Sequence, residues 1–187
     1  MNSPLKLVRP SMNYLPSYVQ ALRRAWSPNH LRPEEATEEL RCIERDPNAF
    51  LTGLTDLGAA GATVTLPDGS QVPRLPGYRR WMWDGEFCGV IGLRWQPGTV
   101  ELPPYYLGHI GYSVVPWKRR LGYASAALAM LLPEARARGL PYVELTADIG
   151  NVASQRVIEA SGGVLLETFK KPAAYGGSEG LRYRIEF

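Results

Sequence analysis

The segment from His109 to Ala127 constrains the fold most, because it changes structural type twice within a few residues. Apolar residues up to Val115 predict a buried strand, and an alanine-rich run after Gly122 predicts a helix. The basic turn Arg119-Arg120 joins the two. The first N–H groups of a helix have no partner inside it. Together with the helix dipole and the two arginines they favour an anion such as a pyrophosphate.

The remaining elements predict one domain, residues 1–187, in which helices cover a mixed sheet. Pro133 is expected to kink or end its helix, and Asp84-Gly85 to form a two-residue hairpin turn. The Gly53–Gly77 excursion predicts a small hairpin within the domain. Helix signals occur at 14–26, 33–45, 49–51, 121–138 and 151–161, and strand patterns at 5–8, 78–83, 87–93, 108–115, 142–146, 164–169 and 181–187.

Composition excludes several classes of protein. The chain has 187 residues, a net charge of +3 and no apolar run long enough for a membrane span or a secretory signal. This charge is too small to argue for nucleic acid, although three arginine pairs keep a basic nucleic-acid-binding domain as a rival. Two cysteines and two histidines, widely separated, predict neither a disulfide framework nor a metal site. We therefore expect a cytoplasmic protein that binds neither membrane nor nucleic acid.

Two motifs together resemble the GCN5-related N-acetyltransferase (GNAT) family. The first, similar to the family's acyl-coenzyme-A signature Gln/Arg-x-x-Gly-x-Gly/Ala, is Val114-Val115-Pro116-x-x-Arg119-x-x-Gly122-x-Ala124. The second, similar to the family's next helix, is Asn151-x-x-Ser154-x-x-Val157-Ile158-Glu159-x-x-Gly162-Gly163. The resemblance covers about 78–187, and the whole pattern is most similar to bacterial predicted acetyltransferases without an assigned acceptor.

The resemblance implies a fold and an activity. The fold is α/β (α+β), with a mixed, mostly antiparallel sheet of about six to seven strands, splayed at the cofactor site and flanked by about four helices. The activity is direct transfer of the acetyl group of acetyl-CoA, as co-substrate, to a primary amine in a ternary complex. We expect a small-molecule acceptor, no metal, and a monomer or homodimer. The alternative is a coenzyme-A-binding sensor or inactive relative.

Cofactor contacts follow from the resemblance residue by residue. The strand end would offer main-chain groups to the pantetheine arm, and the loop would hold the pyrophosphate, with Gly122 allowing close approach. Other interpretations are a solvated basic turn for the loop and a helix N-cap for Asn151. The predicted cofactor-binding residues are Val114, Val115, Arg119, Arg120, Leu121, Gly122, Tyr123, Ala124, Ser125, Asn151 and Ser154.

The acid–base residues are less well specified. Ile158 stands where several relatives have a proton-donating tyrosine, and Gly108 where some have a glutamate base. The catalytic candidates are therefore His109, Tyr112 and Tyr175, each with an alternative role in packing. Alternation puts His109 on the opposite strand face from Tyr112. Some members of the family rely on orienting the amine alone.

Acceptor recognition falls to the N-terminal half and to one later strand. Trp81 and Trp83 share a strand face and either pack against the first helices or form an aromatic wall. Glu144 and Thr146 share a face of the later strand and could line the acceptor side. Acidic residues of the second helix either attract a cationic amine or form a solvated face; they are Glu34, Glu35, Glu38 and Glu39.

Overall fold

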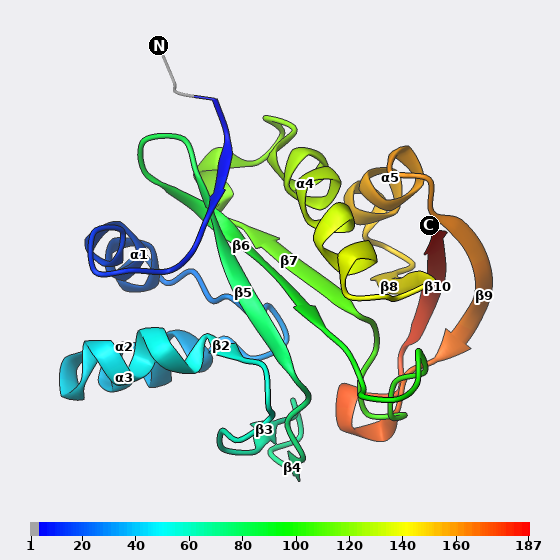
Figure 1. Ribbon diagram of the computed structural model, residues 1–187, viewed down its shortest axis with the longest axis horizontal. Helices are drawn as coiled ribbons and strands as arrows, with labels where there is room; N and C mark the ends of the chain where they lie inside the picture. The colour runs from blue at the N-terminus through cyan, green and yellow to red at the C-terminus, as the bar shows by residue number, and fades with distance from the viewer. Residues whose placement is uncertain (1–3) are drawn as a thin grey trace.

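The computed structural model describes residues 4–187 and places the main strands in two antiparallel sheets that diverge from each other (Figure 1). The first sheet has the order β1-β5-β6-β7, with the short strand β2 also paired to β5, and the second has the order β8-β10-β9. Strands β3 and β4 form the expected hairpin of the excursion. The strands are β1 (Lys6–Val8), β2 (Thr55–Asp56), β3 (Val64–Thr65), β4 (Gln71–Val72), β5 (Gly77–Trp83), β6 (Phe87–Arg94), β7 (Ile110–Val114), β8 (Tyr142–Asp148), β9 (Val164–Lys170) and β10 (Glu179–Glu186).

Helices cover both faces of the first sheet (Figure 1). One face carries α1 (Leu15–Arg23) and α2 (Glu35–Arg45), with α3 (Pro47–Gly53) beside them. The other carries α4 (Tyr123–Ala137), next to α5 (Val152–Ala160). The third helix forms because Asp46 caps it, accepting a hydrogen bond from the Ala49 N–H at 3.0 Å. No helix among residues 4–187 combines the length and apolar content needed to cross a bilayer.

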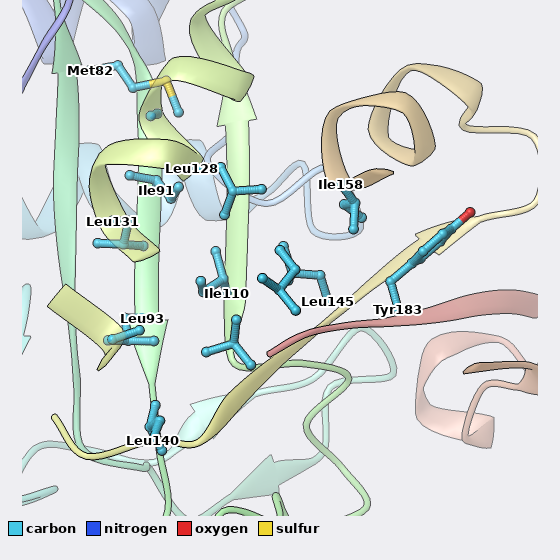
Figure 2. Close-up of a cluster of buried hydrophobic side chains, with 14 of the residues drawn as sticks. Met82, Ile91, Leu93, Ile110, Leu128, Leu131, Leu140, Leu145, Ile158 and Tyr183 are labelled. Carbon is cyan, nitrogen blue, oxygen red and sulfur yellow. The ribbon is translucent and has the colours of Figure 1, made fainter. Parts of the chain in front are cut away.

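One buried cluster joins the two sheets on the α4 side. Figure 2 shows Ile91, Leu93 and Ile110 of the first sheet facing α4, with Leu145 of β8 beside them. Burial of each such side chain stabilises the fold by about 2 kcal/mol. Ile158 of α5 belongs to this cluster and is fully buried. The cluster therefore holds the sheets together on one side and leaves the opposite side open.

Aromatic rings fill the opposite face of the first sheet. Tyr18 of α1 stacks on Trp81 with ring centroids 4.5 Å apart, and Tyr14 contacts Trp83 at 4.7 Å. Because Trp81 is completely buried, it packs against the N-terminal helices and cannot be a wall for an acceptor.

The two sheets meet at a vertex formed by Gly108 and His109. The His109 N–H donates to the Glu144 carbonyl at 2.8 Å, which ties the start of β7 to β8. A Cβ at Gly108 would lie 2.8 Å from that same carbonyl oxygen, so only glycine allows this approach. Beyond the vertex, β7 pairs only with β6 and β8 only with β10 among the described strands.

Two local expectations differ from the structure, the first of them in part. Helix α4 continues through Pro133 to Ala137, so an early stop at this proline was wrong, while a kink there stays a prediction. The one lost backbone bond is outweighed by burial of Leu131 and Ala135 around it. The hairpin between β5 and β6 has a three-residue loop, 84–86, with Trp83 paired to Phe87. The Asp84 side chain of this loop is buried.

Candidate active site

The edge of β7 that faces β8 carries unpaired main-chain groups. Arg94 N–H donates to the His109 carbonyl at 2.9 Å, and Val115 N–H to the Cys88 carbonyl at 3.0 Å, so odd-numbered residues of β7 bond toward β6. The N–H and C=O groups of Tyr112 and Val114 therefore point into the opening, where the Val114 carbonyl already accepts a hydrogen bond from Arg119 and the other three groups have no backbone partner within residues 4–187. These groups match what a pantetheine arm bound like an extra strand would need.

Val115 does not offer the main-chain contacts expected from the sequence. Its N–H is bound to Cys88, and its carbonyl accepts from the Lys118 N–H at 3.0 Å. The strand register makes this alternation inevitable, because neighbouring residues point to opposite edges. Tyr112 thus replaces Val115 as the second edge residue, alongside Val114.

The loop after β7 presents a row of backbone donors. A 3-10 turn, Pro116–Lys118, leads into Arg119, and α4 begins at Tyr123. Arg120 and Gly122 adopt left-handed conformations, with φ of 64° and 76°. None of the N–H groups of residues 120–125 donates a hydrogen bond within the described part of the chain. Such a row at a helix N-terminus is suited to an anion.

The backbone of this loop is accessible from the outside. A Cβ at Gly122 would meet no atom within 4 Å, so the approach to the backbone is open. Ala124 and Ser125 add only small side chains in the first turn of α4. Leu121 is 53% exposed, and Arg119 donates from Nε to the Val114 carbonyl at 3.3 Å. The structure thus brings the predicted loop to one end of the open β7 edge.

A buried carboxylate that the sequence did not single out holds this loop in place. Asp84 Oδ2 accepts from the Tyr123 hydroxyl at 2.6 Å and from Lys118 Nζ at 2.9 Å. Lys118 also pairs with Glu86 at 2.7 Å. Burial alone would raise the pKa of Asp84, but the hydrogen bonds from Tyr123 and Lys118 lower it to about 2. The only sequence signal was the Asp-Gly turn, which says nothing about partners on another element.

Helix α5 begins across the opening from β7. Asn151 caps it, accepting from the Ser154 N–H at 3.1 Å, as the N-cap alternative predicted; its contact with the cofactor stays a prediction. The Tyr112 hydroxyl donates to Ser154, with Oγ at 3.3 Å and the main-chain carbonyl at 3.4 Å, and so reaches from β7 to α5. Burial raises the pKa of Tyr112, which keeps its phenol protonated.

The other two catalytic candidates have their polar atoms engaged. His109 is 1% exposed; its Nδ1 accepts from the Glu144 N–H at 2.9 Å, and its Nε2 lies 2.8 Å from the Val100 carbonyl. Nε2 therefore carries the proton and donates it. Burial lowers the pKa of this imidazole, and we do not assign it the role of base. The Tyr175 hydroxyl donates to the Tyr105 carbonyl at 2.8 Å, which attaches the late loop to the segment before β7.

A cleft of about 1100 Å³ lies beside the opening. Its walls come from α2, the β3–β4 excursion and the loops around Tyr106 and Tyr175, and it reaches Thr146 of β8 and Ser154 of α5. The glutamates of α2 that line the cleft form ion pairs with arginines. Glu144 does not line the cleft and pairs with Arg182 and Arg184. The ion pairs are Arg79 with Glu35 and Glu39, Arg32 with Glu34, Glu35 and Glu38, and Glu144 with Arg182 and Arg184.

A sequence profile of the acetyltransferase (GNAT) domain matches residues 18–164, well over half of the chain. The chain belongs to the GNAT family of acetyltransferases. This confirms the resemblance, the fold class and an acetyl-CoA-dependent acetyltransferase activity. Two solved acetyltransferases of similar fold hold acetyl-CoA or coenzyme A.

Solved GNAT structures share this fold at low sequence identity. The microcin self-immunity acetyltransferase MccE, in complex with acetyl-CoA and AMP, is 13% identical, with a TM-score of 0.62 and coverage of 100% of this chain and 94% of its own. The ribosomal-protein alpha-N-acetyltransferase RimL, with coenzyme A, is 15% identical, with a TM-score of 0.62 and coverages of 98% and 94%. An acetyltransferase from Agrobacterium tumefaciens is 18% identical, with a TM-score of 0.56 and coverages of 100% and 93%. No protein of curated function matches the sequence.

We expect Asp84→Asn to lower the free energy of unfolding by about 3 kcal/mol at pH 7, because it leaves a buried lysine short of its counter-charge. Since the pKa of Asp84 in the fold lies below its unfolded value, the carboxylate stabilises the protein above about pH 4, and this contribution is lost as pH falls toward 2. The difference in free energy of unfolding between Asp84→Asn and wild type should therefore become smaller as the pH falls from about 4 toward 2. Urea unfolding at a series of pH values measures it.

Glu86→Gln is the matched control, because Glu86 pairs with the same lysine but is 57% exposed. Its effect should stay below about 1 kcal/mol. A Glu86 variant as destabilised as the Asp84 variant, or a difference that does not vary with pH, would show that Asp84 is not the anchor of the loop.

Proposed function

We propose that this GNAT protein transfers the acetyl group of acetyl-CoA to a primary amine of a small molecule, directly and within a ternary complex. The observation that carries the proposal is the open edge of β7, which ends at a row of free N–H donors in residues 120–125. The edge suits the amide-bearing pantetheine arm, and the donors suit the pyrophosphate. The thioester would then lie toward the vertex, beside the cleft.

The reaction needs little from the protein besides orientation. The amine nitrogen attacks the thioester carbonyl carbon and loses one proton, while the carbon–sulfur bond breaks and the departing thiolate takes up one proton. Holding the amine and the thioester in the reactive orientation between β7 and β8 supplies a large part of the rate acceleration. The chain therefore requires a proton donor near the sulfur and a cleft that positions the amine.

Tyr112 is the donor that the geometry favours among the candidates. It lies on the edge strand, its hydroxyl is within 3.3 Å of Ser154 Oγ, and burial raises its pKa, so the phenol holds its proton at neutral pH. Ile158 occupies the position at which several relatives have a proton-donating tyrosine. Its side chain is buried in the core and cannot donate a proton. A tyrosine from β7 would thus serve where other members use one from the following helix.

Direct transfer is favoured over a covalent acyl-enzyme. Burial raises the pKa of the Cys88 thiol to about 12, so this sulfur is not a thiolate at neutral pH. Cys42 is exposed on α2 and lines the cleft. The β3–β4 excursion narrows the same cleft, which favours a small acceptor over a folded protein.

We expect Gly122→Glu to abolish acetyl-CoA binding, because a carboxylate would enter the space in front of the N–H donors. Isothermal titration calorimetry with acetyl-CoA measures this. Gly139→Glu is the matched control: Gly139 follows the other end of α4, has a φ of 80°, and a Cβ there would also meet no atom within 4 Å. The control shares the backbone strain and the added charge but should bind acetyl-CoA normally. Equal binding by both variants would refute the loop assignment.

Thiol release from acetyl-CoA over a panel of primary amines tests the activity itself. We expect turnover with at least one small amine, and intersecting lines when both substrates are varied, as a ternary complex requires. Cys42→Ala should leave these kinetics unchanged. Parallel lines would indicate a covalent acyl-enzyme, and tight acetyl-CoA binding without any turnover would favour a coenzyme-A-binding sensor.

Tyr112→Phe should lower kcat by about 100-fold, the loss typical of a general acid, while the KM for acetyl-CoA changes little. Loss of a proton donor should also flatten the alkaline limb of the kcat–pH profile. Tyr175→Phe is the control. Because the Tyr175 hydroxyl donates to a backbone carbonyl, its removal should lower the stability of the protein and leave the shape of the kcat–pH profile largely unchanged. An unchanged kcat for Tyr112→Phe would mean that orientation alone drives the reaction.

A further inference from the structure

The strand floor of the cleft has a bare patch made by two glycines. Gly92 of β6 and Gly111 of β7 are paired directly across the first sheet. Paired residues share a face, and Val90, two residues before Gly92, packs in the cluster beneath α1 and α2. Both glycines therefore face that side of the sheet, and both line the cleft. No side chain from this pair occupies the space above them.

A cation projects over this patch. Arg94 follows Gly92 on the same strand face and lines the cleft. Its Nη2 would lie 3.4 Å from a Cβ at Gly111, so the guanidinium extends along β7, and its Nη1 donates to the Gly108 carbonyl at 3.0 Å. The guanidinium therefore sits at the vertex, where β7 and β8 begin to separate.

Arg94 has no counter-charge, unlike the other cations near it. Arg79 and Arg32 neutralise the acids of α2, and Lys171 pairs with Asp148. Within residues 4–187, no carboxylate lies within 4.0 Å of the Arg94 guanidinium. Its charged neighbour across the sheet is Arg79, and the titratable groups on the facing loops are Tyr106 and Tyr175.

Desolvation of this guanidinium has a cost that a bound anion would offset. Burial, together with the nearby charge of Arg79, lowers the pKa of Arg94. A partly buried cation without a counter-charge gains most from a carboxylate or phosphate, which can accept two parallel hydrogen bonds from the guanidinium. The cleft, which Arg94 and both glycines line, provides the space for such a group beside the guanidinium.

We propose that Arg94 recognises an anionic group, a carboxylate or a phosphate, on the amine acceptor. The acceptor class is thus an amine that also carries a negative charge, such as an amino acid or an aminoalkyl phosphate. The glycine pair admits the anionic group, the vertex fixes its position, and the amine is left directed toward the open edge of β7. This rests on the proposed function for the identity of the second substrate.

Anion binding to the protein already saturated with coenzyme A is the first test, because the coenzyme then occupies the pyrophosphate loop. Acetate and inorganic phosphate, titrated separately at constant ionic strength, serve as probes. We expect wild type to bind one of them at one site, Arg94→Gln to weaken binding by at least about tenfold, and Arg94→Lys to restore part of it. Arg41→Gln, which removes an exposed cation of α2 outside the cleft, should bind as wild type does.

Matched acceptors provide the second test. Thiol release is compared for L-phenylalanine against its amide, and for O-phosphoethanolamine against ethanolamine. We expect the anionic member of a pair to be preferred at least about tenfold in kcat/KM, and Arg94→Gln to erase the preference without changing the KM for acetyl-CoA. The pair that shows the preference tells carboxylate from phosphate.

The two proposals fail in different ways. No anion binding by wild type, or equal binding by Arg94→Gln, overturns the role of Arg94 even if amines are acetylated. Turnover of a neutral amine with the same kcat/KM as its anionic counterpart also overturns the role of Arg94. If coenzyme A itself does not bind, the proposed function has failed, and the anion titration of the unliganded protein still decides the role of Arg94.

Discussion

The structure depends on one contact between its two sheets, the clamp at Gly108 and His109. A backbone hydrogen bond of 2.8 Å ties β7 to β8, and the His109 ring holds the amide of Glu144 on one side and the carbonyl of Val100 on the other. Because the strands are tied only at this end, they must diverge from it. The buried cluster around Leu145 and Ile158 keeps the divergence fixed on one side. The opening between β7 and β8 is thus a consequence of where the sheets are joined.

Most of the fold could be predicted from the sequence, because periodicity and turn residues are local signals. The strand, basic turn and helix around Gly122 are in place, as are the hairpin of β5 and β6 and the N-cap at Asn151. The departures have a common cause in contacts distant in the chain. The helix through Pro133 is held by tertiary packing, and the three-residue hairpin loop contains Asp84, which bonds to Lys118 and Tyr123 on other elements.

The candidate site was predictable to a different degree in its two halves. The loop of backbone donors is encoded by adjacent residues, so its position follows directly from the motif. The residues on the cleft side are not adjacent: Arg94 and Gly111 meet only because β6 and β7 pair in one register. The choice between Val114 and Val115 as edge residues likewise needs the hydrogen-bond pattern, which composition and spacing do not contain.

The unpaired edge of β7 has a consequence beyond substrate binding. Open strand edges are places where foreign strands add and proteins aggregate, and most folds cover or blunt them. Here the edge cannot be covered permanently without closing the site. The pantetheine arm, lying along Tyr112 and Val114, would complete the strand ladder and occupy those groups. While it is bound, the coenzyme would then keep this edge from pairing with a foreign strand.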